Sequence, residues 1–363
     1  MSTDSRLLVG CDRCGRVSEA EASHGTAYFW FPIGHTFGKV TSAFGENQID
    51  AAINRDGGYV GVDLERFEAE KVVGVIEPVL TSREQDDTRV LPLQNGSPSV
   101  ADMGRVRSFT EFAELIRSDS LRQVLTDERL TSHFQPIVSL QDPTEIFAHE
   151  ALLRGIDNDG NHLSPAGLFH QARQAGLLFQ LDLAARRSAI INAVRQGVTS
   201  RLFVNFSPSA IYDPVYCLRT TVGAIREGGL DRSKVVFEVV ESDKADDPQH
   251  LQNILDHYRA AGFKVALDDV GAGYGNLNLM NRLRPDYIKL DMELTRDVDQ
   301  DPYKAMVVSK LLEMANELGI ESIVEGIETK GEFDWARDHG ARYAQGYYIA
   351  RPGPTPRTSI DAS

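Results

Sequence analysis

Short apolar runs alternate with longer amphipathic segments through the last two thirds of the chain, and this rhythm constrains the fold more than any other feature. Eight of the runs have the length and composition of strands: 133–139, 146–153, 201–206, 235–240, 264–268, 286–290, 321–325 and 342–349. Repeated strand–helix units are typical of α/β proteins with a parallel sheet. Eight of them favour a closed (β/α)8 barrel, whose reaction site would lie at the carboxyl ends of the strands. An open doubly wound sheet is the alternative, but no Gly-x-Gly-x-x-Gly motif follows the first strand.

The region before these runs indicates a second, smaller domain. At 363 residues the chain exceeds one average domain. We expect residues 1–85 to form a small mixed α+β domain with a sensory or regulatory role, a helix near residues 46–55, and the aromatic residues 28–31 in its core rather than in a ligand pocket. Residues 86–117 are first polar and turn-rich and then apolar at helical spacing, which predicts a linker followed by a connecting helix.

The charge of the chain limits its partners. A formal net charge of −15 and a pI near 5.1 argue against a nucleic-acid polymer or an anionic membrane surface, because both partners are polyanions. No apolar run approaches the roughly 20 residues that cross a bilayer, and the first residues lack the pattern of a signal peptide. We therefore expect a cytoplasmic protein. Its three cysteines are too few and too unevenly placed for a disulfide framework.

Two of the cysteines have the spacing of a metal knuckle. Cys11 and Cys14 are separated by two residues, and His24 and His35 could complete four ligands for a structural zinc ion. The alternative is a pair of ordinary thiols. The sequence favours the thiols, because it supplies no clear second pair of ligands.

Polar residues stand at or near the ends of the apolar runs. They are Glu150, Asn205, Glu238, Asp268, Asp269, Lys289 and Glu325. The residues two positions earlier are mostly apolar: Ala148, Phe203, Val236, Ala266, Tyr287 and Ile323. Because side chains on a strand alternate between its faces, the apolar set fits a packed barrel interior and the polar set should share one rim. Five carboxylates and one ammonium at that rim need compensating cations or shared protons.

The donor atoms at this rim suggest which cations compensate the charge. They are all oxygens, which favours hard divalent ions such as Mg²⁺ or Mn²⁺ over zinc or copper. Two such ions suit in-line attack of water on a phosphodiester, with Lys289 orienting the water or stabilising the phosphate. The alternative is that surface carboxylates happen to end these strands, as Asp268 and Asp269 would in an ordinary turn.

Motifs around these residues carry a family resemblance. They are Phe134-Gln135-Pro136-Ile137, Glu150-Ala151-Leu152-Leu153-Arg154, Asn205-Phe206-Ser207-Pro208, Glu238-Val239-Val240-Glu241, Asp268-Asp269-Val270-Gly271-Ala272-Gly273-Tyr274, Ile288-Lys289-Leu290-Asp291, Glu325-Gly326-Ile327-Glu328-Thr329 and Gln345-Gly346-Tyr347. In these motifs and their order the chain resembles the EAL-domain cyclic di-GMP phosphodiesterases over residues 118–355, which leaves 356–363 as a tail. The resemblance implies a TIM-like barrel with one reversed strand, two Mg²⁺ or Mn²⁺ ions, and hydrolysis of cyclic di-GMP to linear pGpG.

The resemblance also implies roles for single residues. The implied metal ligands are Glu150, Asn205, Glu238, Asp268, Asp269 and Glu325, with Asp268 as the bridge and with Glu150, Asp268, Glu325 and Lys289 as the catalytic set. The implied substrate contacts are Gln135, Arg154 and Gln345. Glu241, Gly271, Gly273 and Glu328 are implied to couple the glycine-rich loop after Asp269 to a homodimer.

Departures from the family pattern affect packing more than chemistry. Val270 stands where Phe is usual, at the start of the glycine-rich loop, so the dimer coupling is less secure than the ligand set. No metal ligand is missing. We therefore expect an active phosphodiesterase regulated by the N-terminal domain. The alternatives are a catalytically silent cyclic di-GMP receptor and an interaction protein that uses the barrel only as a scaffold.

Overall fold

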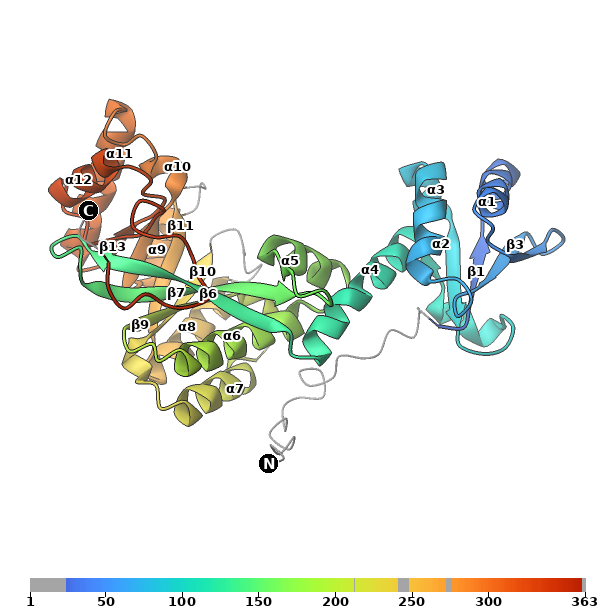
Figure 1. Ribbon diagram of the computed structural model, residues 1–363, viewed down its shortest axis with the longest axis horizontal. Coiled ribbons are helices and arrows are strands. Elements are labelled where there is room, and N and C mark those ends of the chain that lie inside the picture. Colours follow the sequence, from blue (N-terminus) through green and yellow to red (C-terminus); the bar gives the residue numbers. More distant parts are fainter. Residues whose placement is uncertain (1–23, 212, 241–247, 272–275, 361–363) are drawn as a thin grey trace. The chain divides into compact units, whose positions relative to one another are not determined.

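The computed structural model describes residues 24–211, 213–240, 248–271 and 276–360 (Figure 1). These residues form two compact units. One comprises residues 24–129 together with Pro165–Leu178, and the other comprises Leu130–Ser164 together with residues 179–360. Each unit has its own hydrophobic core.

The N-terminal unit is built on an antiparallel sheet with the strand order β2-β3-β1-β4-β5. The strands are β1 (Thr26–Trp30), β2 (Ala51–Asn54), β3 (Tyr59–Asp63), β4 (Arg89–Leu93) and β5 (Arg107–Ser108). The helices are α1 (Gly34–Glu46), α2 (Ala69–Ile76), α3 (Ser82–Asp87) and α4 (Phe109–Thr126), with 3₁₀ turns at Glu77–Val79 and Val100–Arg105. The order β1-α1-β2-β3-α2-α3-β4 is a split βαβ arrangement with β5 added at the edge. The expected mixed α+β character is confirmed.

Alternation along β1 divides the aromatic residues between two faces of this sheet. Phe29 is fully buried in the core and meets Phe112 of α4 edge to face, as the sequence predicts for the core. Tyr28 and Trp30 are half-buried and lie on the other face, where their rings contact Tyr59 of β3.

Two details of this unit differ from the sequence prediction. The prediction of a helix near residues 46–55 is wrong. The helix α1 ends at Glu46, and Gln48 turns the chain with a φ of 56°. Residues 51–54 then form a strand that pairs with β3. The linker expected from residue 86 is also wrong over its first part. There β4 pairs with both β1 and β5 and buries Val90 in the core. The expected connecting helix is present as α4.

The second unit is a closed barrel of eight strands, and the open-sheet alternative is therefore wrong. The strands are β6 (Leu130–Ser139), β7 (Ile146–Ile156), β9 (Arg201–Phe206), β10 (Val235–Val240), β11 (Lys264–Val270), β12 (Tyr287–Leu290), β13 (Glu321–Val324) and β14 (Tyr343–Ala344). β6 is antiparallel to both of its neighbours, β7 and β14, and the remaining barrel pairs are parallel. One reversed strand was predicted. A two-residue strand, β8 (His162–Leu163), pairs with the far end of β7.

Helices follow the strands and cover the outside of the barrel (Figure 1). They are α6 (Leu178–Arg195), α7 (Pro214–Glu227), α8 (Pro248–Ala260), α9 (Asn276–Leu283), α10 (Met292–Thr295), α11 (Pro302–Leu318) and α12 (Lys330–Asp338), with 3₁₀ turns at Pro208–Ala210 and Arg232–Lys234. The remaining helix, α5 (Pro165–Gln174), belongs to the N-terminal unit. Several begin at side-chain caps. Asp213 and Asp301 cap α7 and α11, each ahead of a proline, and Thr329 forms a capping box with Glu332 at α12.

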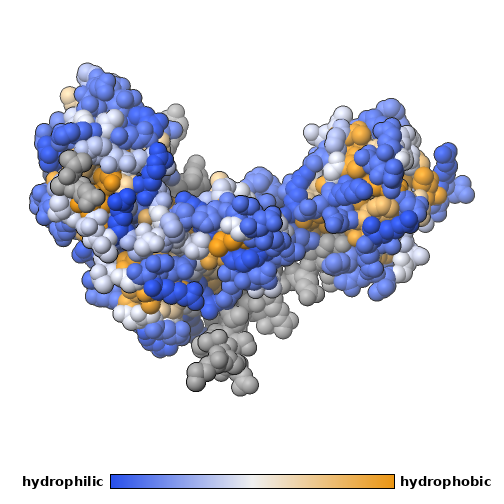
Figure 2. Space-filling model, in the orientation of Figure 1, coloured by the Kyte–Doolittle hydropathy of each residue, from blue (hydrophilic) through white to orange (hydrophobic). Residues whose placement is uncertain are grey.

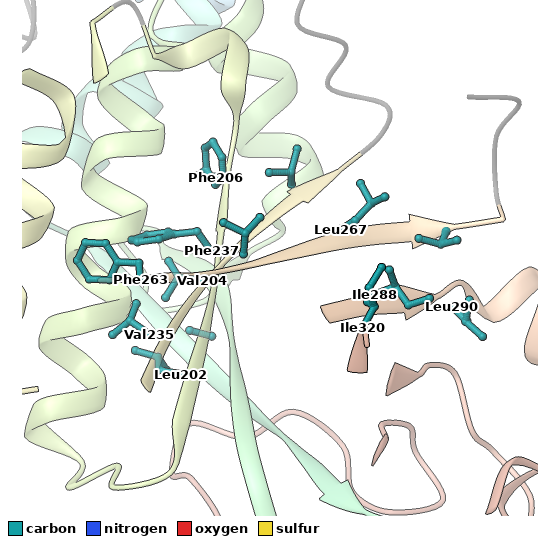
Figure 3. Close-up of a cluster of buried hydrophobic side chains, with 14 of the residues drawn as sticks. Leu202, Val204, Phe206, Val235, Phe237, Phe263, Leu267, Ile288, Leu290 and Ile320 are labelled. Atoms are coloured by element: carbon teal, nitrogen blue, oxygen red, sulfur yellow. The ribbon is translucent and has the colours of Figure 1, made fainter. Parts of the chain in front are cut away.

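Alternating strand residues separate the barrel core into two layers. Outward side chains such as Val204, Phe237 and Ile288 pack in the cluster between strands and helices (Figure 3). Inward side chains form a second cluster inside the barrel: Ile137, Phe147, Ala148, Phe203, Val236, Ala266, Tyr287, Ile323 and Tyr343. All six interior positions expected from the sequence belong to it. This packed layer is the floor beneath the polar residues described next.

The surface of each unit is mainly hydrophilic on the face that Figure 2 displays, with apolar residues in small scattered groups. Among the helices of the described residues, none is both long enough and apolar enough to span a bilayer.

Candidate metal centre and active site

Each strand of the barrel contributes one polar side chain to a layer above the apolar floor. In chain order these are Gln135, Glu150, Asn205, Glu238, Asp268 and Lys289 within strands, and Glu325 and Gln345 directly after β13 and β14. Each stands two positions along its strand from a residue of the interior cluster, so its side chain lies on the inner face. The structure thus brings together the polar residues that the sequence placed on one rim, and adds the two glutamines of β6 and β14.

Lys289 lies among four carboxylates. Its Nζ atom is 2.7 Å from Glu325 Oε1, 2.9 Å from Glu238 Oε1, 3.3 Å from Asp268 Oδ1 and 3.4 Å from Glu150 Oε2. The Lys289 side chain is 1% exposed and that of Glu238 is 0% exposed. One ammonium cannot balance four carboxylates, three of them buried and that of Glu325 partly buried, so the layer has an excess of negative charge that calls for cations or protons.

Amide side chains fix the orientation of Glu150. Asn205 Nδ2 donates to Glu150 Oε1 at 3.0 Å, and Gln345 Nε2 donates to Glu150 Oε2 at 2.7 Å. Gln345 Nε2 also lies 3.2 Å from Gln135 Oε1, and Gln135 Nε2 donates to the carbonyl of Ala350. Both oxygens of Glu150 therefore accept hydrogen bonds from amide side chains of other strands, one from β9 and one from the residue after β14.

A β-bulge places two consecutive carboxylates on the same side of β11. The register between β11 and β12 shifts between Leu267 and Val270, and Asp269 takes a left-handed conformation with a φ of 55°. In a regular strand Asp269 would point away from Asp268. The extra residue of the bulge turns it back toward the site, a use of bulges that is common next to active sites. No local sequence pattern indicates this bulge, because a bulge is defined by pairing with another strand.

Burial and mutual repulsion shift the pKa values of these acids. Burial raises the pKa values of Glu238 and Asp268, and it raises that of Glu325 to about 8 in spite of the opposing effect of Lys289. Burial, together with the charges of Asp268 and Asp291, raises the pKa of Asp269 to about 6. The site therefore retains protons near neutral pH when no cation is bound.

Glu150 and Lys289 shift toward their charged forms. Burial opposes the charge on Glu150, but Lys289 and the amide donors of Gln345 and Asn205 hold its pKa below the usual value. Burial likewise opposes the charge on Lys289, yet the surrounding carboxylates keep its pKa well above the usual value.

The carboxylates form two groups that suit metal binding. Oxygens of Glu150, Glu238 and Asp268 lie within 4.8 Å of one another, and so do oxygens of Asp268, Asp269 and Glu325. Asp268 belongs to both groups. Among the described residues, the buried Glu238 Oε2 and Gln345 Oε1 atoms have no hydrogen-bond partner. An all-oxygen donor set with unsatisfied buried oxygens fits hard divalent cations.

The remaining predicted residues lie around this layer or outside the described residues. Arg154 is on β7, four residues beyond Glu150 and on the same face, and is half-buried. Gly271 has a φ of 114°, and Glu328 pairs with Arg296 at 2.9 Å. His24 and His35 are exposed. Glu241, Gly273, Cys11 and Cys14 lie outside the described residues.

Close backbone packing holds Gln345 in place. A Cβ atom at Gly346 would lie 2.1 Å from the carbonyl oxygen of Ile327, so only glycine fits. The backbone N–H of Ile327 donates to Gln345 O at 3.1 Å, which ties the segment after β14 to the segment after Glu325. The sequence showed Gly346 only as part of a motif, because the approach of a distant backbone segment leaves no local signal.

The family and its curated members match the barrel. The EAL domain family matches residues 118–352. The chain is 29% identical over 242 residues to the probable cyclic di-GMP phosphodiesterase PdeG of Escherichia coli K12, and 32% identical over 238 residues to the probable cyclic di-GMP phosphodiesterase PdeB of the same organism. Each match covers 64% of this chain, and 46% of PdeG or 45% of PdeB. The chain therefore spans less than half the length of these relatives.

Solved structures agree with this match. A standalone EAL protein of Vibrio cholerae O395 in its c-di-GMP-bound form is 33% identical, with a TM-score of 0.58 over 63% of this chain and 95% of that one. BlrP1 of Klebsiella pneumoniae, in a calcium and cyclic di-GMP complex, is 26% identical, with a TM-score of 0.57 over 80% of this chain and 73% of that one. Through residues 118–352, the chain belongs to the EAL domain family.

Proposed function

We propose that the barrel hydrolyses cyclic di-GMP to linear pGpG with two bound divalent cations, Mg²⁺ or Mn²⁺. The observation that carries this proposal is the pair of carboxylate groups that share Asp268. A shared carboxylate between two groups of oxygens suits two cations a few ångströms apart. The relatives named as cyclic di-GMP phosphodiesterases supply the substrate class.

The proposed ligands are Glu150, Asn205, Glu238, Asp268, Asp269 and Glu325. When bound, two cations would lower the pKa of water and neutralise charge on the attacking and leaving oxygens of a phosphodiester. Asn205 and Gln345 orient Glu150 through hydrogen bonds. The packed aromatic and aliphatic floor, with Phe203 and Tyr287 buried beneath the layer, keeps water out from below.

Lys289 is the proposed group for positioning water or phosphate. Its ammonium has three donor protons and at present faces four carboxylate oxygens. Cations that take those oxygens as ligands would leave Lys289 a donor for the attacking water or for a phosphate oxygen. Its fixed positive charge would then stabilise negative charge that develops on phosphorus substituents.

Substrate contacts are proposed for Gln135, Arg154 and Gln345. Arg154 suits a phosphate oxygen, because a guanidinium offers two parallel donors. Gln135 and Gln345 line the inner rim beside Glu150.

We also propose that Gly271 and Glu328, with Glu241 and Gly273, couple the loop after Asp269 to a homodimer. We further propose that the N-terminal unit regulates the barrel. The cytoplasmic location stays a prediction from composition.

The test is hydrolysis of cyclic di-GMP by the full chain with Mg²⁺ or Mn²⁺, followed by separation of the nucleotides. The expected product is pGpG, and a chelator should abolish it. Glu150→Ala is the matched control for contaminating activity. Absence of pGpG with both cations overturns the proposal, and tight binding of the intact nucleotide would then identify a receptor.

A further inference from the structure

A buried ion pair lies on the helix α6, outside the carboxylate layer. Asp182 and Arg186 are one turn apart on α6, and their side chains are 2% and 0% exposed. Arg186 Nη2 lies 2.8 Å from Asp182 Oδ2, and Arg186 Nε lies 2.9 Å from the same oxygen. Burying both charges carries a desolvation cost that their attraction often does not recover, so stability alone is a weak reason for the pair.

The second oxygen of Asp182 holds the chain just beyond β9. Asp182 Oδ1 accepts a hydrogen bond from the backbone N–H of Ser207 at 2.8 Å, and Ser207 is 3% exposed. Ser207 directly follows β9 and precedes the turn Pro208–Ala210. The bond therefore anchors the backbone two residues after Asn205, at the point where the strand would otherwise be free to shift.

Asn205 connects this anchor to the carboxylate layer. Its side chain donates to Glu150 Oε1 at 3.0 Å. The intervening Phe206 is 3% exposed and packs edge to face against Phe237 and Tyr258. A displacement of the Ser207 backbone is thus transmitted to the Asn205 amide, because the residue between them has no room to absorb it.

Arg186 in turn fixes Asp182. Its Nε donates to Asp182 Oδ2, Nη2 makes a close ionic contact with the same oxygen, and Nη1 donates to Thr221 Oγ1 of α7 at 2.9 Å. Thr221 is 1% exposed. Charge-assisted bonds of this kind are shorter and stronger than neutral ones. The arrangement leaves Asp182 one orientation, with Oδ1 toward Ser207.

We propose that Asp182 is a positioning residue for the cation site: held by Arg186, it fixes the Ser207 backbone and so the Asn205 amide that meets Glu150. This inference rests on the proposed function only in that the layer binds divalent cations. Outer partners of metal ligands typically change metal affinity by roughly 10–100-fold when removed.

Two double variants separate the hydrogen bond from the ion pair. Asp182→Asn with Arg186→Met removes both charges but keeps an oxygen that can accept from Ser207. Asp182→Leu with Arg186→Met removes the charges and the acceptor. Replacing a buried ion pair by apolar residues of similar size is often tolerated, so both should fold. Thermal unfolding of each variant checks this.

The measurement is Mn²⁺ binding to the full chain by titration calorimetry, without nucleotide. The leucine variant should bind Mn²⁺ roughly 10–100-fold more weakly than the unmodified chain, and the asparagine variant should keep most of the affinity. Saturating Mn²⁺ should restore hydrolysis by the leucine variant, which a general structural defect would not allow. If the leucine variant does not fold, Thr221→Val takes its place, with a smaller loss in the same direction.

Equal Mn²⁺ affinity in the leucine variant and the unmodified chain overturns the inference. An equal loss in both double variants also overturns it, because the charges and not the acceptor would then matter. Failure of the proposed function would look different from failure of this inference. The unmodified chain would then bind Mn²⁺ but leave cyclic di-GMP intact, and the Mn²⁺ affinities of the variants could still be compared.

Discussion

At the scale of single residues, Lys289 is the ammonium group that lies among the carboxylates of the site. It faces four carboxylate oxygens between 2.7 and 3.4 Å away, and no single ammonium can satisfy all of them. The excess charge is met by protons, as the raised pKa values of Glu325 and Asp269 indicate. Divalent cations at the proposed site would compete with protons for the same oxygens, so both the stability of the site and its affinity for cations should depend on pH.

Without cations, the free energy of unfolding should fall as pH rises. Glu325 has a pKa of about 8 in the folded chain against the usual 4.5, so the folded state binds a proton that the unfolded state releases. The contribution of this proton to the free energy of unfolding is therefore fully present below about pH 4.5 and is lost as the pH rises to about 8. Melting temperatures in a chelating buffer should show this decline, and Glu325→Gln should reduce it. A melting temperature that rises from pH 5 to 8 in the unmodified chain would contradict the assignment.

Loss of one carboxylate should strongly reduce turnover while leaving the fold intact. Glu150→Ala and Asp268→Asn each remove a negative charge whose repulsion the cations would offset, so neither variant should unfold. Turnover should fall roughly 100-fold or more, the scale of several kcal/mol of charge stabilisation. Nucleotide analysis gives the rate, and circular dichroism gives the fold. Collapse of either variant would show that the carboxylate is structural.

At the scale of elements, the bulge in β11 decides where the second carboxylate points. Asp269 keeps a φ of 55°, a conformation that aspartate and asparagine tolerate and β-branched residues do not. The bulge also shifts Val270 into the outer core, where it is 2% exposed. A single inserted residue thus serves packing on one face of the strand and the acidic site on the other.

Two substitutions at this position distinguish conformation from charge. Asp269→Asn and Asp269→Val both remove the carboxylate, and both should weaken cation binding. Only valine strains the left-handed backbone, so Asp269→Val should be less stable than Asp269→Asn by about 1–2 kcal/mol. Urea denaturation compares the two directly. Equal stability would mean that the bulge relaxes when the residue changes.

The sequence could predict the barrel because its signals are local. Alternation within a strand places Ala266 below Asp268 whatever the strand pairs with, and the structure confirms that floor. The bulge at Asp269, the contact at Gly346 and the bond from Asp182 to Ser207 depend on segments far apart in sequence. The roles of the predicted ligands stay predictions.

The N-terminal unit was less predictable for a related reason. β4 contains Pro92 and follows a polar stretch, so its residues look like a linker until their pairing with β1 is known. Local turn chemistry could have located one boundary, since Thr81 and Glu84 form a capping box at the start of α3. The strand β4 has no comparable local sequence signal, because it is recognised only by its pairing with β1.

At the scale of the whole molecule, the helix α4 contributes to the N-terminal core and also contains the start of the family match. Its first half supplies Phe109, Phe112 and Ile116 to the N-terminal core, whereas the EAL match begins at residue 118, inside the same helix. The helix has no break between these parts, from Phe109 to Thr126. A family boundary drawn at residue 118 therefore cuts a continuous element.

Fragments should reveal this dependence. A fragment of residues 1–127 should unfold cooperatively, and one of residues 1–106 should not, because it lacks Phe109 and Phe112, both 0% exposed. Losing each buried phenylalanine costs about 3–5 kcal/mol, most of the stability of a small domain. Thermal denaturation followed by circular dichroism compares the fragments. Cooperative unfolding of the shorter one would show that α4 is dispensable to the N-terminal core.

Because α4 is continuous, the side chains before and after Arg117 keep a fixed rotation about the axis of this helix. Successive residues of an α-helix turn by about 100°, so one residue inserted after Arg117 would rotate Leu121 and Val124 by that angle relative to Phe112. Seven inserted residues would restore the angle to within about 20°. An exchange of N-terminal domains within α4 would therefore preserve the orientation of the helix faces only for certain insert lengths, and would be restricted by length as well as by sequence.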